Sequence, residues 1–458
     1  MSTDSINLAL AGLDVTRARI DTLTRNITNA QTDGYTKKTD SQVVDALGEV
    51  SLGPIQRTVD ESLLKTLRDT TGTQNQLQTT VTTLSRLETA FGTPSANTSL
   101  SAQITKLQNA FQNVSINPEQ TSLYSTVINA ASDITRSFHQ LSQSVTDATG
   151  DATAQLKQAV TTVNQTLTAL NALNNQIVAH AGNEDASDLQ DQRDRLLNTL
   201  SGLMDITTFI KPTGAVGVYT RDGKPLVDGA VATLSLGGTT GLTWSSSNSA
   251  AAPVTVGSGT IGGLLTLQAT TLPAVQAQLD DIARALTVEF NAINVPIFYQ
   301  PGATAFNPLA DTGYAAIIAV NPTVTQSTIH DGAVPAQVLV PGTALALGDT
   351  TFIDQAVALF NRTNVAFTVS GLPANGNLAQ VATDFITGQS TLRANAQDAL
   401  TSETTLKNTL QTTLSSQSGV NVDDEVAQLT VLQNAYSANA RVLQTAKDMF
   451  TTLFNAFQ

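Results

Sequence analysis

The sequence predicts a mainly α-helical protein with a β-rich insertion, and two observations carry that prediction. Long stretches in both halves of the chain repeat apolar residues at three- and four-residue steps, which is the period of an amphipathic helix. Between these stretches, in residues 206–260, β-branched and aromatic residues are spaced by Asp-Gly turn dipeptides. The chain of 458 residues has no cysteine, so packing alone must hold its elements together.

The composition excludes several classes of partner. Only 13% of the residues are charged and the net charge is −14, so the polar surface consists mostly of Ser, Thr, Asn and Gln. An acidic chain without a Lys/Arg cluster repels nucleic acids and anionic membranes, and we expect neither as a partner. No uncharged apolar run approaches the ~18 residues of a membrane span, and the N-terminus lacks the pattern of a cleaved signal peptide.

The first expected element is an N-terminal helix that ends near Asn29. Its apolar residues keep alternating four- and three-residue steps once Arg17 and Thr24 are counted as polar members of the stripe. Asp33-Gly34 then provides a turn. The apolar residues of this seam are Ile6, Leu10, Leu13, Ile20 and Ile27.

Long helices are expected in the middle of the chain. Residues 60–204 keep helical spacing, with breaks at "GTPSAN" and "NPEQ". The spacing returns in residues 275–293 and again from Phe385 to Leu414. Helices of this kind predict an elongated bundle. The Pro/Gly-rich region 296–349 is expected to form a second small β insertion or an irregular loop.

The last helix is expected to begin after Asn421 and to run to the final residue. Asn421 with Asp424 three residues later resembles an N-terminal cap, and acidic residues suit the positive end of a helix dipole. We therefore interpret Asp423, Asp424 and Glu425 as capping residues. The seam residues of this helix are Val426, Leu429, Tyr436, Leu443, Phe450 and Phe454.

These elements predict four parts. Residues 1–40 and 415–458 form a terminal coiled-coil domain. Residues 41–205, 261–295 and 350–414 form the helical bundle. Residues 206–260 form a β-rich outer domain, and residues 296–349 form the second insertion.

The terminal helices need partners, because a lone helix with one narrow apolar stripe is marginal in water. Two alternatives are open. The helices pair with each other or with the bundle inside one molecule, or they fold only against other copies in an assembly. Periodicity does not choose between the two.

Three segments resemble a known family. The segment "LALAGLDVTRARIDTLTRNITNAQTDGYTKKT", with Asn26-Ile-x-Asn29 and then Gly34-Tyr35, is similar to the N-terminal signature of bacterial flagellar axial proteins of the rod, hook and hook-filament junction. The C-terminal "SGVNVDDEVAQLTVLQNAYSANARVLQTAKDMFTTLF" resembles the hook-associated junction branch of that superfamily. The helix "IGGLLTLQATTLPAVQAQLDDIARALTVEFNAIN" resembles the inner bundle helix of the same branch.

The resemblance implies a structural subunit at the junction between hook and filament. The terminal helices would pack as the inner layer of a hollow filament, through the two seams together with Asn26, Asn29, Gly34 and Tyr35. Implied partners are further copies of the chain, the hook protein, the next junction protein (hook-associated protein 3) and a cytoplasmic export chaperone on the C-terminal helix. Type III export without a cleaved signal peptide is also implied. Regions 206–260 and 296–349 match no pattern and are shorter than the outer domains of larger relatives, so an outermost domain is expected to be missing.

Motifs for chemistry are weak. Gly257, Gly259 and Gly262 match Gly-x-Gly-x-x-Gly, with Asp280 and Asp281 at the distance of a ribose partner, but no βαβ unit precedes them and Pro273 falls inside the following helix. We interpret the match as a β-to-helix junction.

Metal sites and catalytic residues are not predicted either. The histidines His139, His180 and His330 are scattered, and the acids at 423–425 lack the spacing of a calcium loop. We expect no cofactor, no metal and no enzymatic activity. The alternatives to a junction subunit are a hook or rod subunit and a cytoplasmic helical adaptor protein.

Overall fold

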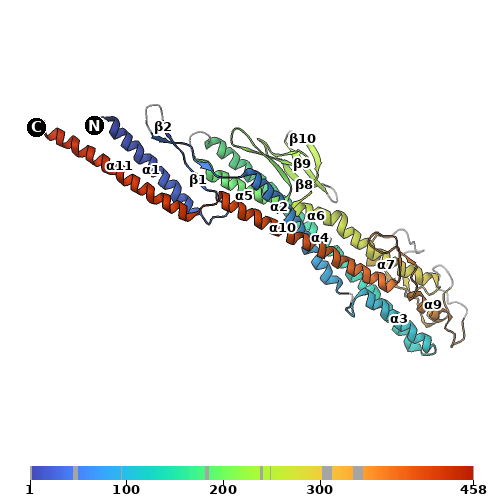
Figure 1. Cartoon of the computed structure of the whole chain (residues 1–458). Helices are drawn as coiled ribbons and strands as arrows, with labels where there is room; N and C mark the ends of the chain where they lie inside the picture. Colours follow the sequence, from blue (N-terminus) through green and yellow to red (C-terminus); the bar gives the residue numbers. More distant parts are fainter. Residues whose placement is uncertain are drawn as a thin grey trace. The chain divides into compact units, whose positions relative to one another are not determined.

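The computed structural model describes residues 3–44, 50–93, 95–180, 185–237, 241–247, 249–301, 312–333 and 344–456 (Figure 1). It divides into two compact units of interleaved segments. Unit 1 comprises Met1–Asn75, Ala159–Thr260 and Ser402–Gln458, and unit 2 comprises Gln76–Gln158 and Ile261–Thr401. Long helices dominate both units and small antiparallel sheets accompany them, so the predicted mainly α fold with a β insertion is confirmed.

Unit 1 contains the two terminal helices. Helix α1 (Thr3–Asn29) ends at the predicted residue, and α11 (Val422–Ala456) begins directly after its predicted cap. Asn421 Oδ1 accepts a hydrogen bond from the Asp423 amide at 3.1 Å, so Asn421 caps the helix as expected. The expected continuation of this helix over residues 457–458 lies outside the described residues.

The rest of the helical part of unit 1 comes from α5 (Ser187–Leu203) and from portions of three long helices: α2 (Glu61–Phe91), α4 (Thr121–His180) and α10 (Leu378–Ser418). The segment between α1 and α2 forms two short antiparallel ladders, additional to the predicted β insertion. Strand β1 (Lys38–Thr39) pairs with β4 (Gln56–Arg57), and β2 (Gln42–Val44) pairs with β3 (Val50–Leu52).

The predicted β insertion forms two three-stranded antiparallel sheets. One has the order β5 (Ile206–Ile210), β6 (Val216–Thr220), β7 (Pro225–Val227); the other has the order β10 (Ser249–Val254), β9 (Gly241–Ser246), β8 (Thr233–Gly237). The predicted turn at Asp222-Gly223 joins β6 to β7, and Gly223 has a φ of 79°, which glycine adopts without strain.

Two asparagines of α4 attach these sheets to the helix. The Asn164 amide pairs with the Leu234 backbone at 2.8 and 2.9 Å, and the Asn174 amide pairs with the Val216 backbone at 2.8 and 3.0 Å. Each amide donates and accepts as a peptide group does. The helix therefore completes the hydrogen bonding of β8 and β6 through side chains.

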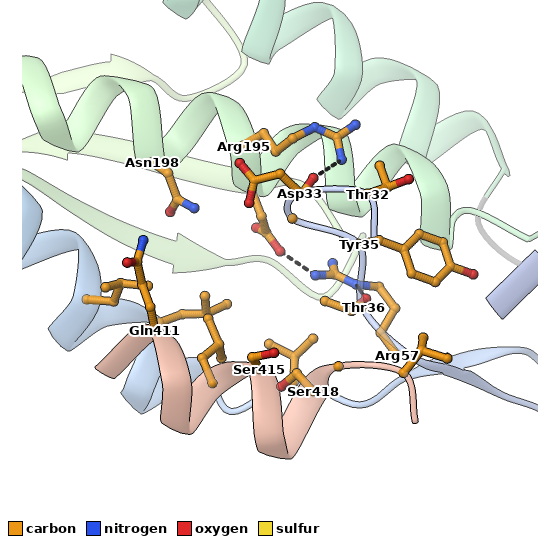
Figure 2. Close-up of a pocket in the computed structure, with 18 of the residues that line it drawn as sticks. Thr32, Asp33, Tyr35, Thr36, Arg57, Arg195, Asn198, Gln411, Ser415 and Ser418 are labelled. Atoms are coloured by element: carbon orange, nitrogen blue, oxygen red, sulfur yellow. Dashed lines mark hydrogen bonds and ion pairs between the residues drawn. The ribbon is translucent and has the colours of Figure 1, made fainter. Parts of the chain in front are cut away.

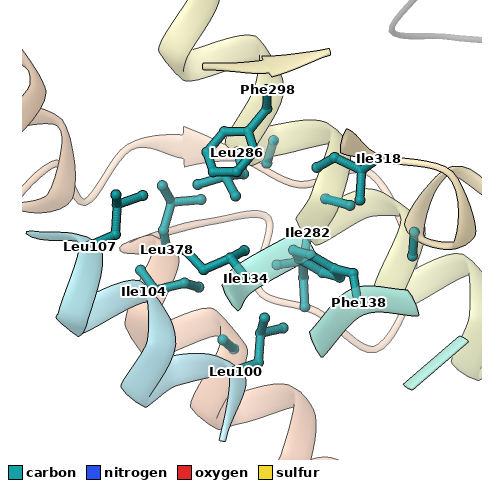
Figure 3. Packing of buried hydrophobic residues seen from close by; sticks show 14 of the residues in the cluster. Leu100, Ile104, Leu107, Ile134, Phe138, Ile282, Leu286, Phe298, Ile318 and Leu378 are labelled. Carbon is teal, nitrogen blue, oxygen red and sulfur yellow. The ribbon is translucent and has the colours of Figure 1, made fainter. Parts of the chain in front are cut away.

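Unit 2 encloses the largest apolar cluster, made by α3 (Leu100–Ile116), the first part of α4, α7 (Leu272–Ala292), α9 (Thr351–Phe360) and the first part of α10. Figure 3 shows Ile104, Ile134, Phe138 and Leu286 converging in it, and all four are fully buried. Such packing stabilises by removing apolar area from water. The predicted bundle helices therefore have their core here.

The predicted helix around Pro273 is divided by a π-helical turn. Helix α6 (Gly259–Thr266) is followed by a π turn (Leu267–Thr271), and α7 then starts with Pro273 in its first turn. Proline is tolerated in a first turn because the amide there has no intrahelical partner. The local change of helix type is how the sequence accommodates this proline.

Residues 296–349 are mostly irregular in their described part. Strand β11 (Phe298–Tyr299) pairs with β12 (Ala319–Val320), and a 3-10 turn (Tyr314–Ala316) and α8 (Gln326–His330) complete the segment. A further short ladder, β13 (Val365–Ala366) with β14 (Asn375–Gly376), follows α9.

Two buried carboxylates of α7 hold these irregular segments. Asp280 accepts hydrogen bonds from the amides of Gly313 (2.6 Å) and Ala315 (2.8 Å). Asp281 accepts from the amides of Thr368 (2.7 Å) and Val369 (3.1 Å). These contacts give both acids a structural role.

Replacing Asp280 by Ala should destabilise the chain, because two amides lose a charged acceptor in a buried setting. We expect the free energy of unfolding to fall by roughly 2–4 kcal/mol. Urea denaturation followed by circular dichroism measures the change. Asp147→Ala, at an exposed site of α4, is the matched control and should change stability by about 0.5 kcal/mol or less. Equal effects of the two substitutions would contradict the assignment.

Candidate assembly surface

The two terminal helices run antiparallel against each other (Figure 1). Gly12 lies opposite Asn439, where an added Cβ would come within 3.2 Å of the Asn439 Nδ2, and Asn26 is hydrogen-bonded to Glu425. Gly12 and Asn26 are 14 residues apart, and so are Glu425 and Asn439. The two helices therefore keep one register along their length, and of the two alternatives left open by periodicity, the structure has the pairing within one chain.

The face that each helix turns to the other is displaced from its predicted apolar seam. On α11 the residues facing α1 follow seven-residue steps: Glu425, Leu432, Asn439 and Ala446, of which all but Asn439 are buried. Glu425 lies one position before the seam residue Val426, and the other three lie one position before the seven-residue repeats of Val426, a displacement of about 100° around the helix. The same one-residue displacement holds on α1, where the facing residues are Ala9, Gly12, Thr16, Leu23 and Asn26.

Small and polar residues such as Gly12, Thr16 and Asn439 therefore make much of the contact between the helices, together with the buried Leu23 and Leu432. Thr16 can be buried because its hydroxyl donates to the Gly12 carbonyl at 2.6 Å. Gly12 and Ala9 let the two backbones come close. The contact consequently uses only part of the large apolar surface of the helices.

The predicted seams flank this contact. Six of their members are half-buried: Ile6, Leu13, Ile20, Ile27, Leu429 and Leu443. Four more are exposed: Leu10 (48%), Val426 (46%), Tyr436 (42%) and Phe450 (37%). The side chain of Phe454 lies outside the described residues.

Further large apolar side chains that sequence reasoning missed are also exposed on the pair: Leu8 on α1, and Val431, Val442 and Met449 on α11. Scattered exposed apolar residues are normal, but so many exposed large apolar side chains along α11, with two more near the start of α1, are typical of a protein interaction surface. We call the exposed residues Leu8, Leu10, Val426, Val431, Tyr436, Val442, Met449 and Phe450 the outer apolar rows.

At the inner end of the helix pair, Asn26 forms the centre of a buried polar cluster. Its Nδ2 donates to the Lys38 carbonyl and to Glu425 Oε2, both at 2.9 Å. Its Oδ1 accepts from the Tyr35 hydroxyl at 2.9 Å and from the Lys38 amide at 3.1 Å. All four hydrogen-bonding positions of this fully buried amide are thus used, and they join α1, the turn after it, β1 and α11.

Glu425 is not only a capping residue, so that interpretation of the sequence was incomplete. Its side chain is fully buried and pairs with Lys37 Nζ at 2.8 Å besides its bond to Asn26. A buried carboxylate without such partners would be strongly destabilising. Asp423 and Asp424, in contrast, are exposed.

A ladder of buried ion pairs continues from this cluster to α5. Lys38 contacts Asp188 and pairs with Asp191 at 3.1 Å, and its ammonium lies 3.8 Å from the centre of the Tyr35 ring. Asp191 also forms an ion pair with Arg57, whose Nε lies 2.9 Å from Asp191 Oδ1. No local pattern in the sequence singled out Lys38, Asp191 or Arg57. The only available signal was that charged residues are scarce in this chain, so each one is a candidate for a specific role.

The other predicted motif residues shape the turn. Asn29 Nδ2 donates to the Arg25 carbonyl at 2.9 Å. Gly34 has a φ of 69°, and a Cβ there would come within 2.8 Å of the Arg195 side chain. Asn26 and Tyr35 belong to the buried cluster, so the structure brings the motif residues together at one end of α1.

Outside this surface, the glycines of the Gly-x-Gly-x-x-Gly match have a structural role. The Gly257 amide donates to Asp205 Oδ1 at 3.1 Å, and a Cβ on Gly259 would come within 2.4 Å of the Leu203 carbonyl. These glycines therefore permit close packing at the β-to-helix junction, as predicted.

The remaining candidates give no catalytic or metal centre. His139 Nε2 lies 2.8 Å from the Ile318 carbonyl oxygen, and His330 Nδ1 lies 2.6 Å from Asp331. No group of three or more metal-ligating side chains occurs among the residues that the structure describes. Nor does any helix in that part of the chain have the length and apolar character to cross a membrane.

The pKa values of two groups in the cluster are displaced upward. Burial raises the pKa of the Tyr35 hydroxyl above its ordinary value of 10.0. Burial of Lys38 opposes its charged form, but hydrogen bonding to Asp188 and the charge of Asp191 outweigh it and raise the pKa of the ammonium above 10.5.

Asn26→Ala should loosen the helix pair from the rest of unit 1. The substitution removes four hydrogen bonds and leaves buried groups of Lys38 and Glu425 with fewer partners, so we expect a loss of roughly 2–4 kcal/mol in the free energy of unfolding. Amide hydrogen exchange should become faster in residues 3–29 and 422–456. Asn7→Ala, at an exposed site of α1, is the control. Unchanged protection in Asn26→Ala would exclude the role.

Alkaline pH should weaken the same cluster. Because both pKa values are raised in the folded state, the folded chain binds more protons than the unfolded chain above about pH 10, so stability falls as pH rises through that range. The free energy of unfolding measured in urea between pH 9 and pH 11.5 should fall more steeply for the wild type than for Lys38→Met. Identical slopes would show that Lys38 does not contribute.

Comparisons with known proteins point to one family. The family model for the helical domain of the flagellar hook-associated protein FlgK matches residues 84–296, and the model for the C-terminal part of the flagellar basal body rod proteins FlgEFG matches residues 411–456. These two flagellar models together match more than half of the chain. They include the C-terminal helix and the bundle helix on which the resemblance was based.

Curated relatives agree over nearly the whole length. Flagellar hook-associated protein 1 of Salmonella typhimurium is 24% identical, with 98% of this chain and 99% of that protein covered. The protein of that name from Escherichia coli is 23% identical over 98% and 99%, and that of Bacillus subtilis is 27% identical over 49% and 47%. The Salmonella alignment spans 556 positions, more than the length of this chain, so that relative has segments which this chain lacks.

Among solved structures, the flagellar hook junction protein FlgK from Burkholderia pseudomallei is similar at 23% identity and a TM-score of 0.48, covering 53% of this chain and 48% of that one. The identification does not depend on this likeness. From the family models and the relatives that match from end to end, the chain belongs to the flagellar hook-associated protein 1 family.

Proposed function

We propose that this chain is a structural subunit of the bacterial flagellum at the junction between hook and filament, and that it assembles through the outer apolar rows of α1 and α11. Its role is structural and not enzymatic. The observation that carries the proposal is the displacement of the helix contact, which leaves large apolar residues such as Leu10 and Tyr436 exposed.

Energetics favour assembly through several neighbours at once. Complete burial of a large apolar side chain stabilises by about 1.5–3 kcal/mol. The side chains of the outer apolar rows are already partly covered, so each gains roughly half of that on burial. Association itself costs about 4–15 kcal/mol, so a contact of two or three of these side chains does not hold two copies together. A subunit that packs against several neighbours along both helices buries enough apolar area to offset this cost.

Further partners follow from the same surface. A second copy, the hook protein and hook-associated protein 3 would each meet the subunit in the axial structure. Before export, an amphipathic helix with exposed apolar residues is a suitable ligand for a helix-binding groove, so we assign α11 to a cytoplasmic export chaperone. Export through the type III apparatus without a cleaved signal peptide completes the proposal.

The substitution Tyr436→Asp should prevent assembly and leave the monomer folded. Tyr436 is 42% exposed, so an acid there costs the free chain little, whereas burial in an interface leaves its charge unpaired. In cells whose own copy is replaced, we expect loss of filaments and of swimming. With purified protein, we expect a monomer in sedimentation velocity where the wild type forms larger species.

Thr430→Asp is the matched control on the same helix, since Thr430 is exposed and polar. It should assemble like the wild type. Circular dichroism must show that both variants are helical. Normal filaments with Tyr436→Asp would refute the assignment of this row to assembly.

A further inference from the structure

A cavity of about 520 Å³ lies in unit 1 at the inner end of the helix pair (Figure 2). Its wall is formed by the turn of residues 30–36, the start of α2, the end of α5 and the last turns of α10. The turn directly follows α1, and the end of α10 directly precedes α11. We call this cavity the turn pocket.

The turn pocket combines an apolar wall with cations that have no acidic partner. Leu64, Leu67 and Leu414 provide the apolar part. Arg195 Nη1 donates to the Asp33 carbonyl at 3.4 Å, and Lys407 Nζ donates to Gln74 Oε1 at 2.8 Å. Among the described residues, neither cation has a carboxylate within ion-pair distance, in a chain whose net charge is −14.

The neighbouring charges at the pocket are already neutralised. Asp194 pairs with Arg57 and, at 3.3 Å, with Arg68. Arg195 and Lys407 are therefore the charges that remain available to a ligand. They favour an occupant with an acidic group next to apolar side chains.

An unsatisfied hydroxyl gives a second, independent indication. Ser418 is 4% exposed and lines the turn pocket, and its Oγ has no hydrogen-bond partner in the part of the chain that the structure describes. Buried polar groups nearly always have a partner, so an orphaned one requires an explanation. A polar group of an occupant would satisfy it.

The outer end of α11 has the complementary chemistry. Met449 is 46% exposed and Phe450 is 37% exposed. Among the described residues, the carboxylate of the neighbouring Asp448 accepts a side-chain hydrogen bond only from the amide Gln444 Nε2, at 2.9 Å. Lys447 lies only two positions before Met449 in the sequence. Because it shares helical spacing with Leu443 and Tyr436, it lies on a different face of α11 from Met449.

The turn pocket and this segment lie at opposite ends of one helix pair. The 26 steps from Val422 to Asp448 rise about 39 Å as a helix, so a chain cannot fill its own pocket with this segment. Two complementary patches at opposite ends of a rigid element produce a head-to-tail contact, which continues into an open helical assembly. The chemistry thus selects a second copy as the occupant.

We propose that the turn pocket receives Asp448, Met449 and Phe450 of a second copy of this chain. Asp448 pairs with Lys407 and Arg195, and Met449 and Phe450 contact Leu64, Leu67 and Leu414. Met449 suits an irregular pocket because its unbranched side chain adapts its shape. The inference rests on the proposed assembly function and adds the specific contact between neighbouring subunits.

Disulfide trapping tests the contact directly, because the chain has no native cysteine. The variant Gln411→Cys/Met449→Cys places one thiol at the turn pocket and one at the outer end of α11. On oxidation of assembled protein, we expect a ladder of covalent multimers on non-reducing gels, which disappears with reductant. Gln411→Cys/Val442→Cys, two helical turns away on α11, is the control and should give no more multimer than Gln411→Cys alone.

Charge reversal tests the ion pair in the same assay. Adding Lys407→Glu should reduce the covalent multimer several-fold, and adding Asp448→Lys to that variant should restore it. If the variant Gln411→Cys/Met449→Cys assembles like the wild type but forms no covalent multimer, this inference is overturned and the proposed function stands. Stronger trapping between Gln411→Cys and Leu10→Cys would also overturn it, because α1 would then fill the pocket. Failure of the wild type to assemble would refute the proposed function itself.

Discussion

The buried amide of Asn26 is the contact on which the terminal part of unit 1 depends. It connects the end of α1, the first β strand and the start of α11 through four hydrogen bonds, one of which ends on the ion-paired carboxylate of Glu425. Directional bonds of this kind fix a register in a way that apolar contact does not. Because the helix pair is held at this end, its antiparallel alignment from Glu425 to Asn439 is defined.

The fixed register explains why the apolar stripes of the terminal helices are not used up within the chain. With Asn26 opposite Glu425, many of the positions that meet along the pair are small or polar ones, such as Gly12 and Asn439. Rotation of each helix by about 100° would bring the large apolar residues together but would break the cluster. The polar cluster therefore determines which surface stays available to other subunits.

Much of the fold could be predicted from periodicity. The end of α1 at Asn29, the Asn421 cap, the breaks in the bundle and the β insertion between α5 and α6 follow from local patterns that local physics enforces. The face that α1 turns to α11 could not be predicted, because a hydrophobic stripe shows which residues avoid water but not which partner covers them. The assembly role of the predicted seam residues stays a prediction, because the pairing of the helices inside one chain does not test it.

The buried ion pairs were beyond sequence reasoning for a different reason. Lys38, Asp191 and Glu425 are far apart in the sequence, and each alone is typical of an exposed charge. Glu425 was interpreted as a capping residue because it lies in the first turn of a helix next to two acids that are indeed exposed. Only the three-dimensional return of the chain, with β1 between α5 and α11, brings their charges together.

The two kinds of contact suit the two tasks of a junction subunit. Inside the chain, hydrogen bonds and ion pairs hold the helices in one arrangement, since a shifted register would leave Glu425 or Lys38 buried without partners. In the proposed assembly, the outer apolar rows would provide contact between subunits that is not directional, so small displacements of neighbouring copies would keep most of the area buried. A subunit between a curved hook and a stiff filament requires both: a rigid building block, and contacts that tolerate slightly different neighbours on its two sides.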